Sequence, residues 1–257
     1  MLNFGLIGRR RSDPLAALIT QLFGNAEQGA FYVPMPIVNG VQSLFQDAAG
    51  TTPVTADGDP VGRMLDQSGN GNHATQTVSG SKPVYRTDGV LHWLEFDGVD
   101  DFLTHMAART LGAFTISVAH RETTRKISSP YGAGSSSDSR LQAHLPYSNG
   151  NYYFDTVDSS AGRISGAWPL AVGDDAVTAH YRKANDVVEA RINGTTAGTV
   201  TIDTTVTSRA VSIGRTEYNK SNYYAGRVYG FAIVFADKSE DVSQLESYLA
   251  SLNEVTL

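Results

Sequence analysis

The chain of 257 residues contains no cysteine, so no disulfide stabilises it and no thiolate can act as a nucleophile or metal ligand. Charged residues are scarce, at 18%, and the net charge of −6 is modest, which gives no global reason to expect nucleic-acid binding. Long apolar runs are missing too. The run from Gly230 to Ala236 is far short of the roughly 20 residues that a membrane-spanning helix needs. We therefore expect no membrane span and a fold held by its packed core.

Two short helices are predicted, one near each end of the chain. Asp13 suits a helix cap, Pro14 the first helical position and Gly24 the residue after the end. Between them, apolar residues recur with helical spacing and predict one buried face. A helix of about ten residues is marginal alone, so it needs a surface on this protein or on a neighbour. The second helix is expected to start at a Ser239 cap and to bury Val242, Leu245, Leu249 and Leu252.

From about residue 82 onward, alternating apolar and polar residues predict β-strands. The clearest of these segments are residues 114–120, 177–181, 187–192, 199–202, 210–213 and 227–235. The pair Asn193-Gly194, flanked by two of them, is a strong signal for a tight hairpin. By contrast, residues 132–150 are rich in Ser, Gly and Asn and predict long exposed loops. The pattern as a whole predicts an all-β fold.

An ordered set of motifs resembles a known family. The segments LDQSGNGNHA (65–74) and LEFDGVDDFL (94–103) are followed by the strand 114–120, the hairpin 188–194, the closing strands 212–233 and the helix 237–252. Together they resemble the concanavalin A-like lectin/glucanase jelly roll of the laminin-G type. The resemblance implies an all-β jelly-roll β-sandwich with a short N-terminal helix or arm and a C-terminal helix packed on it. Such a scaffold serves recognition and assembly more often than catalysis.

Residues 1–60 lie outside that pattern and are predicted to be an N-terminal arm and docking segment, with the sandwich at residues 61–257. Residues 29–34 and 43–55 resemble the lead-in of tailed-bacteriophage structural proteins. That resemblance implies a virion component made in the host cytoplasm: a capsid decoration, fibre or tail-associated protein. Its expected partners are other virion proteins and further copies of itself.

The predicted attachment surface combines a cationic run with apolar anchors. The arginines either form a solvated arm or pair with carboxylates of a neighbour, while the apolar side chains dock. Under this hypothesis, removal of residues 1–30 leaves the sandwich folded. The expected interface residues are Arg9, Arg10, Arg11, Leu15, Leu18, Leu22, Phe23, Phe31 and Tyr32.

Motifs for catalysis are missing. Glucanases of the family that the chain resembles carry Glu-x-Asp-x-x-Glu or Glu-x-Asp-x-Glu, because retaining hydrolysis needs two carboxylates about 5 Å apart. Glu95-Phe96-Asp97 matches in part only, since Val99 and Asp100 occupy the two places for the third acid. The sequence also lacks Gly-x-Ser-x-Gly, His-Glu-x-x-His and a phosphate loop. We therefore predict a non-enzymatic protein with no catalytic residue and no cofactor.

Two weak candidates for structural calcium remain. Asp66-x-Ser68-x-Asn70-Gly71 matches the first half of a calcium-binding loop, but Thr77 stands where a bidentate Glu is needed. A second oxygen-rich cluster comprises Asp97, Asp100 and Asp101. We prefer ordinary turns, in which Asp and Asn bind the local backbone, as the explanation of both patterns. No metal site is assigned on this basis.

Aromatic residues in or beside Gly-, Asn- and Ser-rich segments give an alternative function. A flat ring can stack on the apolar face of a sugar while polar groups bind its hydroxyls. The same residue types also favour protein interfaces, and strand alternation should place about half of them in the core. The alternative is therefore a carbohydrate-binding adhesin for host surface polysaccharide. The candidates are Tyr147, Tyr152, Tyr153, Trp168, Tyr218, Tyr223 and Tyr224.

Overall fold

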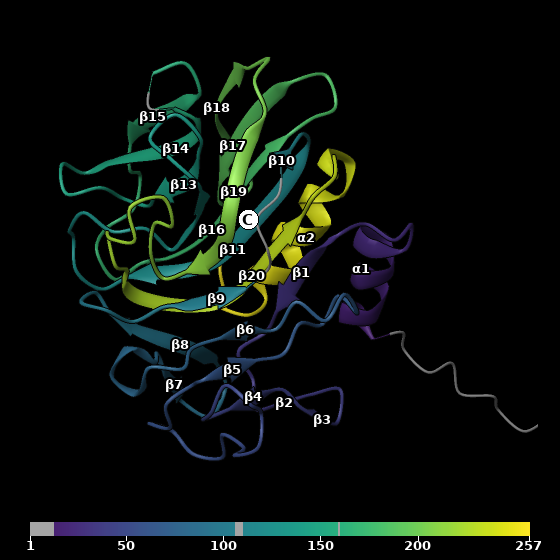
Figure 1. The fold of residues 1–257 in the computed structure, drawn as a ribbon, viewed down its shortest axis with the longest axis vertical. Coiled ribbons are helices and arrows are strands. Elements are labelled where there is room, and N and C mark those ends of the chain that lie inside the picture. Colours follow the sequence, from purple (N-terminus) through teal and green to yellow (C-terminus); the bar gives the residue numbers. More distant parts are fainter. Residues whose placement is uncertain (1–12, 106–109, 159) are drawn as a thin grey trace, which may run out of the picture.

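The structure is a computed structural model that describes residues 13–105, 110–158 and 160–257 (Figure 1). Two antiparallel sheets are stacked face to face. We call the sheet that lies between the other sheet and the two α-helices the middle sheet. It has eight strands in the order β18-β17-β16-β11-β20-β8-β7, with β1 paired to β20. The outer sheet has ten strands in the order β15-β14-β13-β12-β19-β9-β6-β5-β4, with β10 paired to β19. This arrangement confirms the predicted all-β sandwich.

The bounds of the elements are as follows. The middle sheet contains β1 (Gly29–Tyr32), β7 (Val84–Thr87), β8 (His92–Asp97), β11 (Phe114–Glu122), β16 (Asp175–Arg182), β17 (Val187–Ile192), β18 (Thr195–Thr201) and β20 (Ala225–Val234). The outer sheet contains β4 (Leu44–Phe45), β5 (Arg63–Met64), β6 (Ala74–Thr75), β9 (Leu103–His105), β10 (Thr110–Leu111), β12 (Tyr131–Gly134), β13 (Arg140–His144), β14 (Asn151–Val157), β15 (Arg163–Ala167) and β19 (Val206–Ile213). The other elements are the hairpin β2 (Ile37–Val38) and β3 (Val41–Gln42), the 3₁₀ turns η1 (Ser79–Ser81) and η2 (Ser239–Asp241), and the helices α1 (Pro14–Phe23) and α2 (Val242–Ala250).

Strand alternation divides the buried side chains between two cores. In β11, Phe114, Ile116 and Val118 lie in the core between the sheets, whereas Ala119 faces the helices. In β20, Phe231 follows the same rule and joins the core between the sheets. The middle sheet is therefore buried on both faces, which explains why β20 reads as a nearly continuous hydrophobic run from Val228 to Val234.

The two α-helices cover the face of the middle sheet that points away from the outer sheet (Figure 1). Leu22 of α1 and Leu245 of α2 are fully buried in the second core with outward residues of β20. Gly230 permits the close approach of α2, because a Cβ atom there would lie 2.7 Å from both Leu249 and Leu252. No helix in the described part of the chain combines the length and apolar character needed to cross a membrane.

The predicted start of α1 is confirmed, and that of α2 is refined. Asp13 caps α1 by accepting a hydrogen bond from the Leu15 backbone N–H at 3.0 Å. At the other end of the chain, η2 precedes α2, so the α-helix begins at Val242 rather than directly after Ser239. Asp237, not Ser239, supplies the acceptor there, because its Oδ1 binds the Ser239 N–H at 3.0 Å.

Residues 13–34, which we call the strap, form part of the sandwich. Strand β1 pairs with the Phe231–Val234 half of β20, while β8 pairs with the Ala225–Val228 half. Beyond the strap, β4 continues the edge of the outer sheet. The expected boundary at residue 60 is therefore not a structural division, since strands from before it lie in both sheets.

The six apolar residues predicted to anchor a partner are buried in this chain instead. Their exposed fractions lie between 0 and 7%, because five of them belong to the core beneath the helices and Tyr32 lies in the core between the sheets. The docking prediction is wrong for these side chains: Leu15, Leu18, Leu22, Phe23, Phe31 and Tyr32. Arg9, Arg10 and Arg11 lie outside the described residues.

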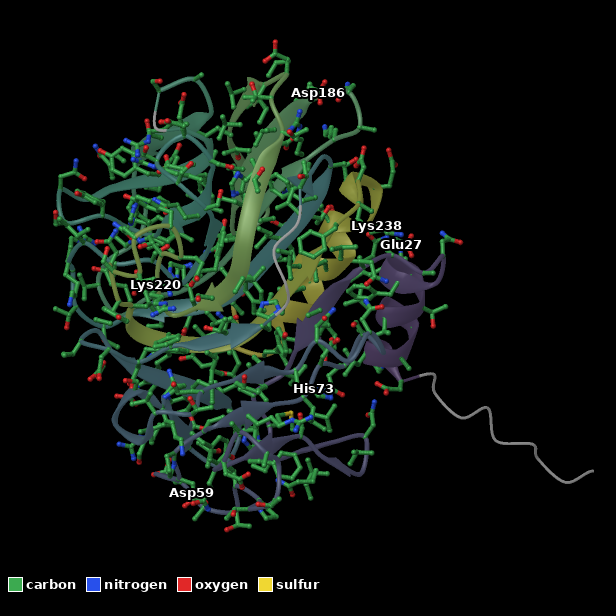
Figure 2. All side chains as sticks on the ribbon, viewed as in Figure 1. Glu27, Asp59, His73, Asp186, Lys220 and Lys238 are labelled. Atoms are coloured by element: carbon green, nitrogen blue, oxygen red, sulfur yellow. The ribbon has the colours of Figure 1, made fainter. Side chains whose placement is uncertain are left out.

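An ion pair also holds the strap to the segment after β20. Lys238 Nζ donates to Glu27 Oε1 at 2.5 Å and to the Gln21 carbonyl at 3.0 Å, and Figure 2 shows Lys238 and Glu27 side by side near α1. Both side chains of the pair are about nine-tenths buried, at 10% and 12% exposure. Since a shielded pair is screened less than one in open solvent, this contact reinforces the apolar packing of α1.

Two glycine-containing turns make different connections in the structure. Asn193 and Gly194 join β17 to β18, and their φ angles of 45° and 73° fit the tight hairpin that was predicted. Asp97-Gly98 instead ends β8 in the middle sheet, and the chain next enters β9 in the outer sheet. The second turn is thus a corner between the sheets.

The segment predicted as long exposed loops contains two strands. β12 and β13 lie within residues 132–150 or at their edge, and β12 pairs with β19 in the outer sheet. Gly132 and Gly134 sit where a Cβ atom would lie 2.7 Å or less from neighbouring backbone. Glycine is therefore needed here for close packing of strands, a role that composition alone cannot distinguish from loop flexibility.

Candidate functional site

A pocket of about 380 Å³ lies on the solvent-facing side of the outer sheet, over β13 and β14. The neighbouring residues Leu141, Ala143 and Phe154 point the other way, into the core. We call this site the tyrosine pocket. It is lined by Ile127, Arg140, Gln142, His144, Tyr147, Tyr153, Arg163, Tyr218, Asn219 and Asn222.

The register of three strands decides which side chains meet at the floor of the pocket. Asp155 in β14 is opposite Gln142 in β13 and Arg163 in β15, so these three residues form one row across the sheet. In the adjacent row, Tyr153 is opposite His144. Because cross-strand neighbours on one face have Cβ atoms about 5 Å apart, the rows bring separated sequence positions into contact.

Asp155 is completely buried, and arginine and glutamine donors bind both of its oxygens. Arg163 donates from Nε to Oδ1 at 2.6 Å and from Nη2 to Oδ2 at 2.9 Å. Gln142 Nε2 donates to Oδ2 at 3.2 Å. The hydrogen bond to Asp155 is the main cause that raises the pKa of Arg163, and the two-pronged contact fixes the position of both side chains.

His144 contributes a neutral group to the floor. Its Nδ1 lies 2.8 Å from the Ser128 carbonyl oxygen, which can only accept, so Nδ1 carries the proton. Its Nε2 then accepts from Gln142 Nε2 at 3.2 Å. Burial is the main cause that lowers the pKa of His144, so the ring carries no charge at neutral pH.

Three tyrosine rings from different segments form the walls. Arg163 lies over the Tyr153 ring at 4.4 Å, and Arg140 lies over the Tyr218 ring at 4.9 Å. Tyr147 meets Tyr153 edge-to-face, with ring centroids 5.5 Å apart. Tyr147 follows β13, and Tyr218 lies in the loop between β19 and β20, whose exposed residue Lys220 is labelled in Figure 2. Neighbouring groups therefore hold each ring in position.

Tyr147, Tyr153 and Tyr218 are three of the seven aromatic residues predicted to bind carbohydrate, and the structure brings them together. Tyr152 does not join them, because alternation along β14 turns it inward. Its hydroxyl donates to the Ala197 carbonyl at 2.9 Å, and its ring packs in the core between the sheets.

The other three predicted aromatic residues lie away from the tyrosine pocket. Tyr224 is fully buried, and its hydroxyl lies 2.9 Å from Nδ1 of His120. Trp168 packs against the edge of the core, and Tyr223 lies beside Phe102 with a centroid separation of 6.4 Å. These contacts give Tyr224 and Trp168 packing roles rather than a shared surface with the pocket.

The polar floor of the pocket was missed by sequence reasoning. Arg140, Gln142 and His144 belong to β13, which was predicted to be part of a loop. The alternation Arg140-Leu141-Gln142-Ala143-His144 was a usable signal for a strand with a polar outer face. The role of Asp155 depends on cross-strand register, so no local pattern marks it.

Asp66 and Asn70, two of the weak calcium candidates, both form hydrogen bonds within the protein. The oxygens of Asp66 accept hydrogen bonds from the backbone N–H groups of Phe31, Ser68 and Asn72, at 2.9–3.0 Å. Asn70 directs its amide N–H groups, which are donors, to carbonyls of the strap at 3.1 and 3.2 Å. This motif is a clamp that holds β1, and it uses the oxygens that calcium would need.

Asp97, Asp100 and Asp101 do come together, with one oxygen of each within 4.8 Å of the others. Hydrogen bonds of the turn occupy part of this cluster. Asp97 Oδ1 accepts from the Val99 N–H at 2.8 Å, and Asp101 Oδ2 accepts from the Asp97 N–H at 3.0 Å. Burial, with the nearby Asp97 and Asp100 charges, raises the pKa of Asp101 to about 7. No metal is assigned at this turn, and the cluster stays the weak calcium candidate of the sequence analysis.

Comparison with known proteins supports the fold. No protein-family model and no curated protein matches the sequence. A GH54 α-L-arabinofuranosidase soaked with a cyclic sulfate inhibitor has a TM-score of 0.61 at 13% identity, over 91% of this chain and 65% of that chain. The binding domain of botulinum neurotoxin serotype D gives 0.57 at 10% identity, over 92% of this chain and 53% of that chain.

A third similar structure is domain 4 of AbnA, an extracellular GH43 arabinanase from Geobacillus stearothermophilus, in complex with arabinotriose. Its TM-score is 0.53 at 13% identity, over 66% of this chain and 86% of that chain. At such identities the likeness concerns the fold alone. It agrees with the lectin-like β-sandwich that the motifs predicted.

Proposed function

We propose that the protein is a non-catalytic carbohydrate-binding module and that a sugar ring binds in the tyrosine pocket. The observation that carries this proposal is the convergence of Tyr147, Tyr153 and Tyr218 around a polar floor. A sugar has apolar C–H faces that pack on flat rings and hydroxyls that need fixed hydrogen-bonding partners. Asn222 in the lining has both donors and an acceptor for such hydroxyls, and Asn219, whose Oδ1 already accepts from the Thr216 hydroxyl at 2.6 Å, adds donors.

The chemistry of the lining favours binding over hydrolysis. Glycosidases of the common type need a pair of carboxyl groups across the scissile bond. The residues that line the tyrosine pocket include neither Asp nor Glu. Asp155 lies beneath them with no exposed surface, and its oxygens are bound to Arg163 and Gln142. Among proteins of similar fold, the arabinanase domain in complex with arabinotriose supports the glycan proposal.

The virion role rests on the resemblance of residues 29–34 and 43–55 and stays a prediction, as do the virion location, the virion partners and the oligomeric state. The strap side chains that were expected to attach the protein to a particle are in its own core. Of the two predicted functions, we therefore propose carbohydrate recognition, with host polysaccharide as the class of target.

A glycan array followed by calorimetric titration of the best binder tests this proposal. Tyr153→Ala and Tyr218→Ala should each weaken binding about tenfold or more, which corresponds to about 1.4 kcal/mol for a lost stacking surface. Tyr223→Ala is the matched control, because Tyr223 is a partly exposed tyrosine beside Phe102 outside the pocket. Failure of the native protein to bind any glycan, or equal binding by all three variants, would contradict the proposal.

Hydrolysis should be measured on the same glycans. Incubation of the protein with each bound oligosaccharide should release no shorter product. Product release that depends on residues of the tyrosine pocket would show that the module is an enzyme, and the non-catalytic part of the proposal would then be wrong.

A further inference from the structure

We propose that the glycan bound by the tyrosine pocket is acidic and that its carboxylate or sulfate group pairs with Arg140. This inference rests on the proposed carbohydrate-binding function and specifies the chemical class of the ligand. It is carried by the charge balance of the pocket and by the unequal bonding of its two arginines.

The pocket has one more positive than negative charge. Arg140 and Arg163 are the two cations of the lining, and Asp155 beneath them is the single carboxylate in contact with both. His144 does not change the balance, because its Nε2 accepts a hydrogen bond and the ring is neutral. The protein as a whole has a net charge of −6, so the excess positive charge is local to this site.

Arg163 forms hydrogen bonds to the Asp155 carboxylate, and Arg140 does not. Two hydrogen bonds at 2.6 and 2.9 Å join Arg163 to both oxygens of Asp155. The nearest nitrogen of Arg140 is 3.7 Å from Asp155 Oδ2, which is outside hydrogen-bonding distance. Since Gln142 also donates to Oδ2, the carboxylate is already bound by better-placed donors. Arg140 therefore has a nearby opposite charge without a hydrogen bond to it.

The Arg140 guanidinium is also held in place and short of partners. It stacks on the Tyr218 ring at 4.9 Å, and only 17% of its side chain is exposed. Its Nε is buried without a hydrogen-bonding partner in the described part of the structure. A ligand cannot reach Nε there, but the two terminal nitrogens at the edge of the planar guanidinium can bind both oxygens of a carboxylate or sulfate. An acidic sugar that stacks on the tyrosines can supply those oxygens.

The experiment compares sugars that differ only in charge. The array should contain lactose with 6-sulfolactose, and trigalacturonic acid with its methyl ester, among neutral, carboxylated and sulfated glycans. We expect the binders to be acidic and the uncharged member of a bound pair to bind at least tenfold more weakly. The two pairs distinguish a sulfate from a carboxylate as the recognised group. Raising the salt concentration should weaken the acidic ligand selectively.

Arg140→Gln should abolish the preference for the acidic member, with at least a tenfold loss of its affinity. Arg86→Gln is the matched control, because it removes the same charge from a partly exposed arginine of β7 that pairs with Asp57 and Glu95 in the middle sheet. Arg140→Lys keeps the charge but not the two-pronged geometry, so its affinity should be intermediate. Thermal unfolding of each variant checks that the sandwich is intact.

The outcomes separate this inference from the proposed function. Binders that are all neutral, an ester that binds as well as its acid, or a folded Arg140→Gln variant with full affinity for the acid would overturn the inference and leave carbohydrate binding intact. The absence of any bound glycan on the array would overturn the proposed function, and the inference would fall with it.

Discussion

The strap and the tyrosine pocket both place aromatic residues beside turn-rich sequence, yet the chain uses the two regions in opposite ways. Phe31 and Tyr32 of the strap have no exposed surface. Tyr147, Tyr153 and Tyr218 remain partly exposed around the pocket. The strap is uninterrupted by charge from Gly29 to Pro34, whereas the pocket alternates arginine, glutamine and histidine with core residues. The comparison shows that interleaved polar residues, rather than aromatic content, separate the partly exposed surface of the pocket from a core element.

The pairing of β20 explains why the strap packs against this chain's own middle sheet. β8 pairs with only one half of β20, so the half at Phe231–Val234 needs another strand on that side. An unpaired edge and an uncovered apolar face are both liabilities in water. The strap removes both, because β1 completes the hydrogen bonding and α1 covers the face beside α2. The side chains of such a segment are buried within this chain, so the same side chains cannot also anchor a partner.

The largest effect is expected from removing the strap. Deletion of residues 1–34 should abolish cooperative unfolding, because it exposes the β20 edge and the second core. Circular dichroism during heating would measure this, and a synthetic peptide of residues 13–34 added in trans should restore part of the transition. A truncated protein with the melting temperature of the full chain would instead support the separate docking arm.

A smaller effect is expected from breaking the clamp that holds the strap. Asp66→Ala should lower the free energy of unfolding by about 2–3 kcal/mol, because the buried N–H of Phe31 and the half-buried N–H of Asn72 lose their carboxyl acceptor. Urea titration would measure the change. Asp88→Ala is the control, since Asp88 makes similar bonds to Val90 and Leu91 in an exposed turn and should matter less. Equal effects of the two substitutions would contradict a special role for Asp66.

Acid should loosen the same region through His105, whose ring packs edge-to-face on Tyr32 of the strap at 5.1 Å. Burial lowers the pKa of His105 to about 3 from 6.5, so the unfolded chain takes up a proton first as the pH falls. Stability should therefore decline between pH 6.5 and pH 3, by about 2 kcal/mol at pH 5 for this residue.

Because leucine cannot be protonated, His105→Leu should reduce the difference in stability between pH 7 and pH 5 by about that amount. His120 and His180, whose pKa values burial also lowers to about 3, will still contribute to the acid sensitivity. Urea titrations at the two pH values would measure the difference. An unchanged pH dependence in His105→Leu would show that His105 is not among the titrating groups.

The smallest effect on stability is expected in the tyrosine pocket. Tyr153→Ala should change the free energy of unfolding by less than about 1 kcal/mol, because the ring is partly exposed and the strand ladder of β14 is retained. The same variant should lose glycan binding. A substitution in the pocket can therefore affect binding without affecting stability, which a substitution in the strap cannot. A loss of stability as large as that of Asp66→Ala would make the pocket a structural element.

Local patterns were enough for those parts of the fold that local interactions determine. Residues 114–120 alternate cleanly and form β11, Asn193-Gly194 makes the predicted hairpin, and Asp13 caps α1. Each depends on neighbours within a few positions of the chain, which is why periodicity and turn chemistry predict them. The aromatic residues near turns were also recognisable from local sequence. The grouping of three of them around one pocket was not.

What the sequence by itself determined is therefore the all-β class, the two helices, most strands of the middle sheet and a set of tyrosines near turns. Only the tertiary structure decided that the strap fills the β20 edge, that glycine-rich β12 is a strand, and that Asp155 binds Arg163 while Arg140 stays without a hydrogen bond to it. The reason is that these outcomes depend on partners distant along the chain. The residues of the pocket come together through the register of β13, β14 and β15 and through the position of Tyr218 in the loop after β19. No short window of sequence contains that information.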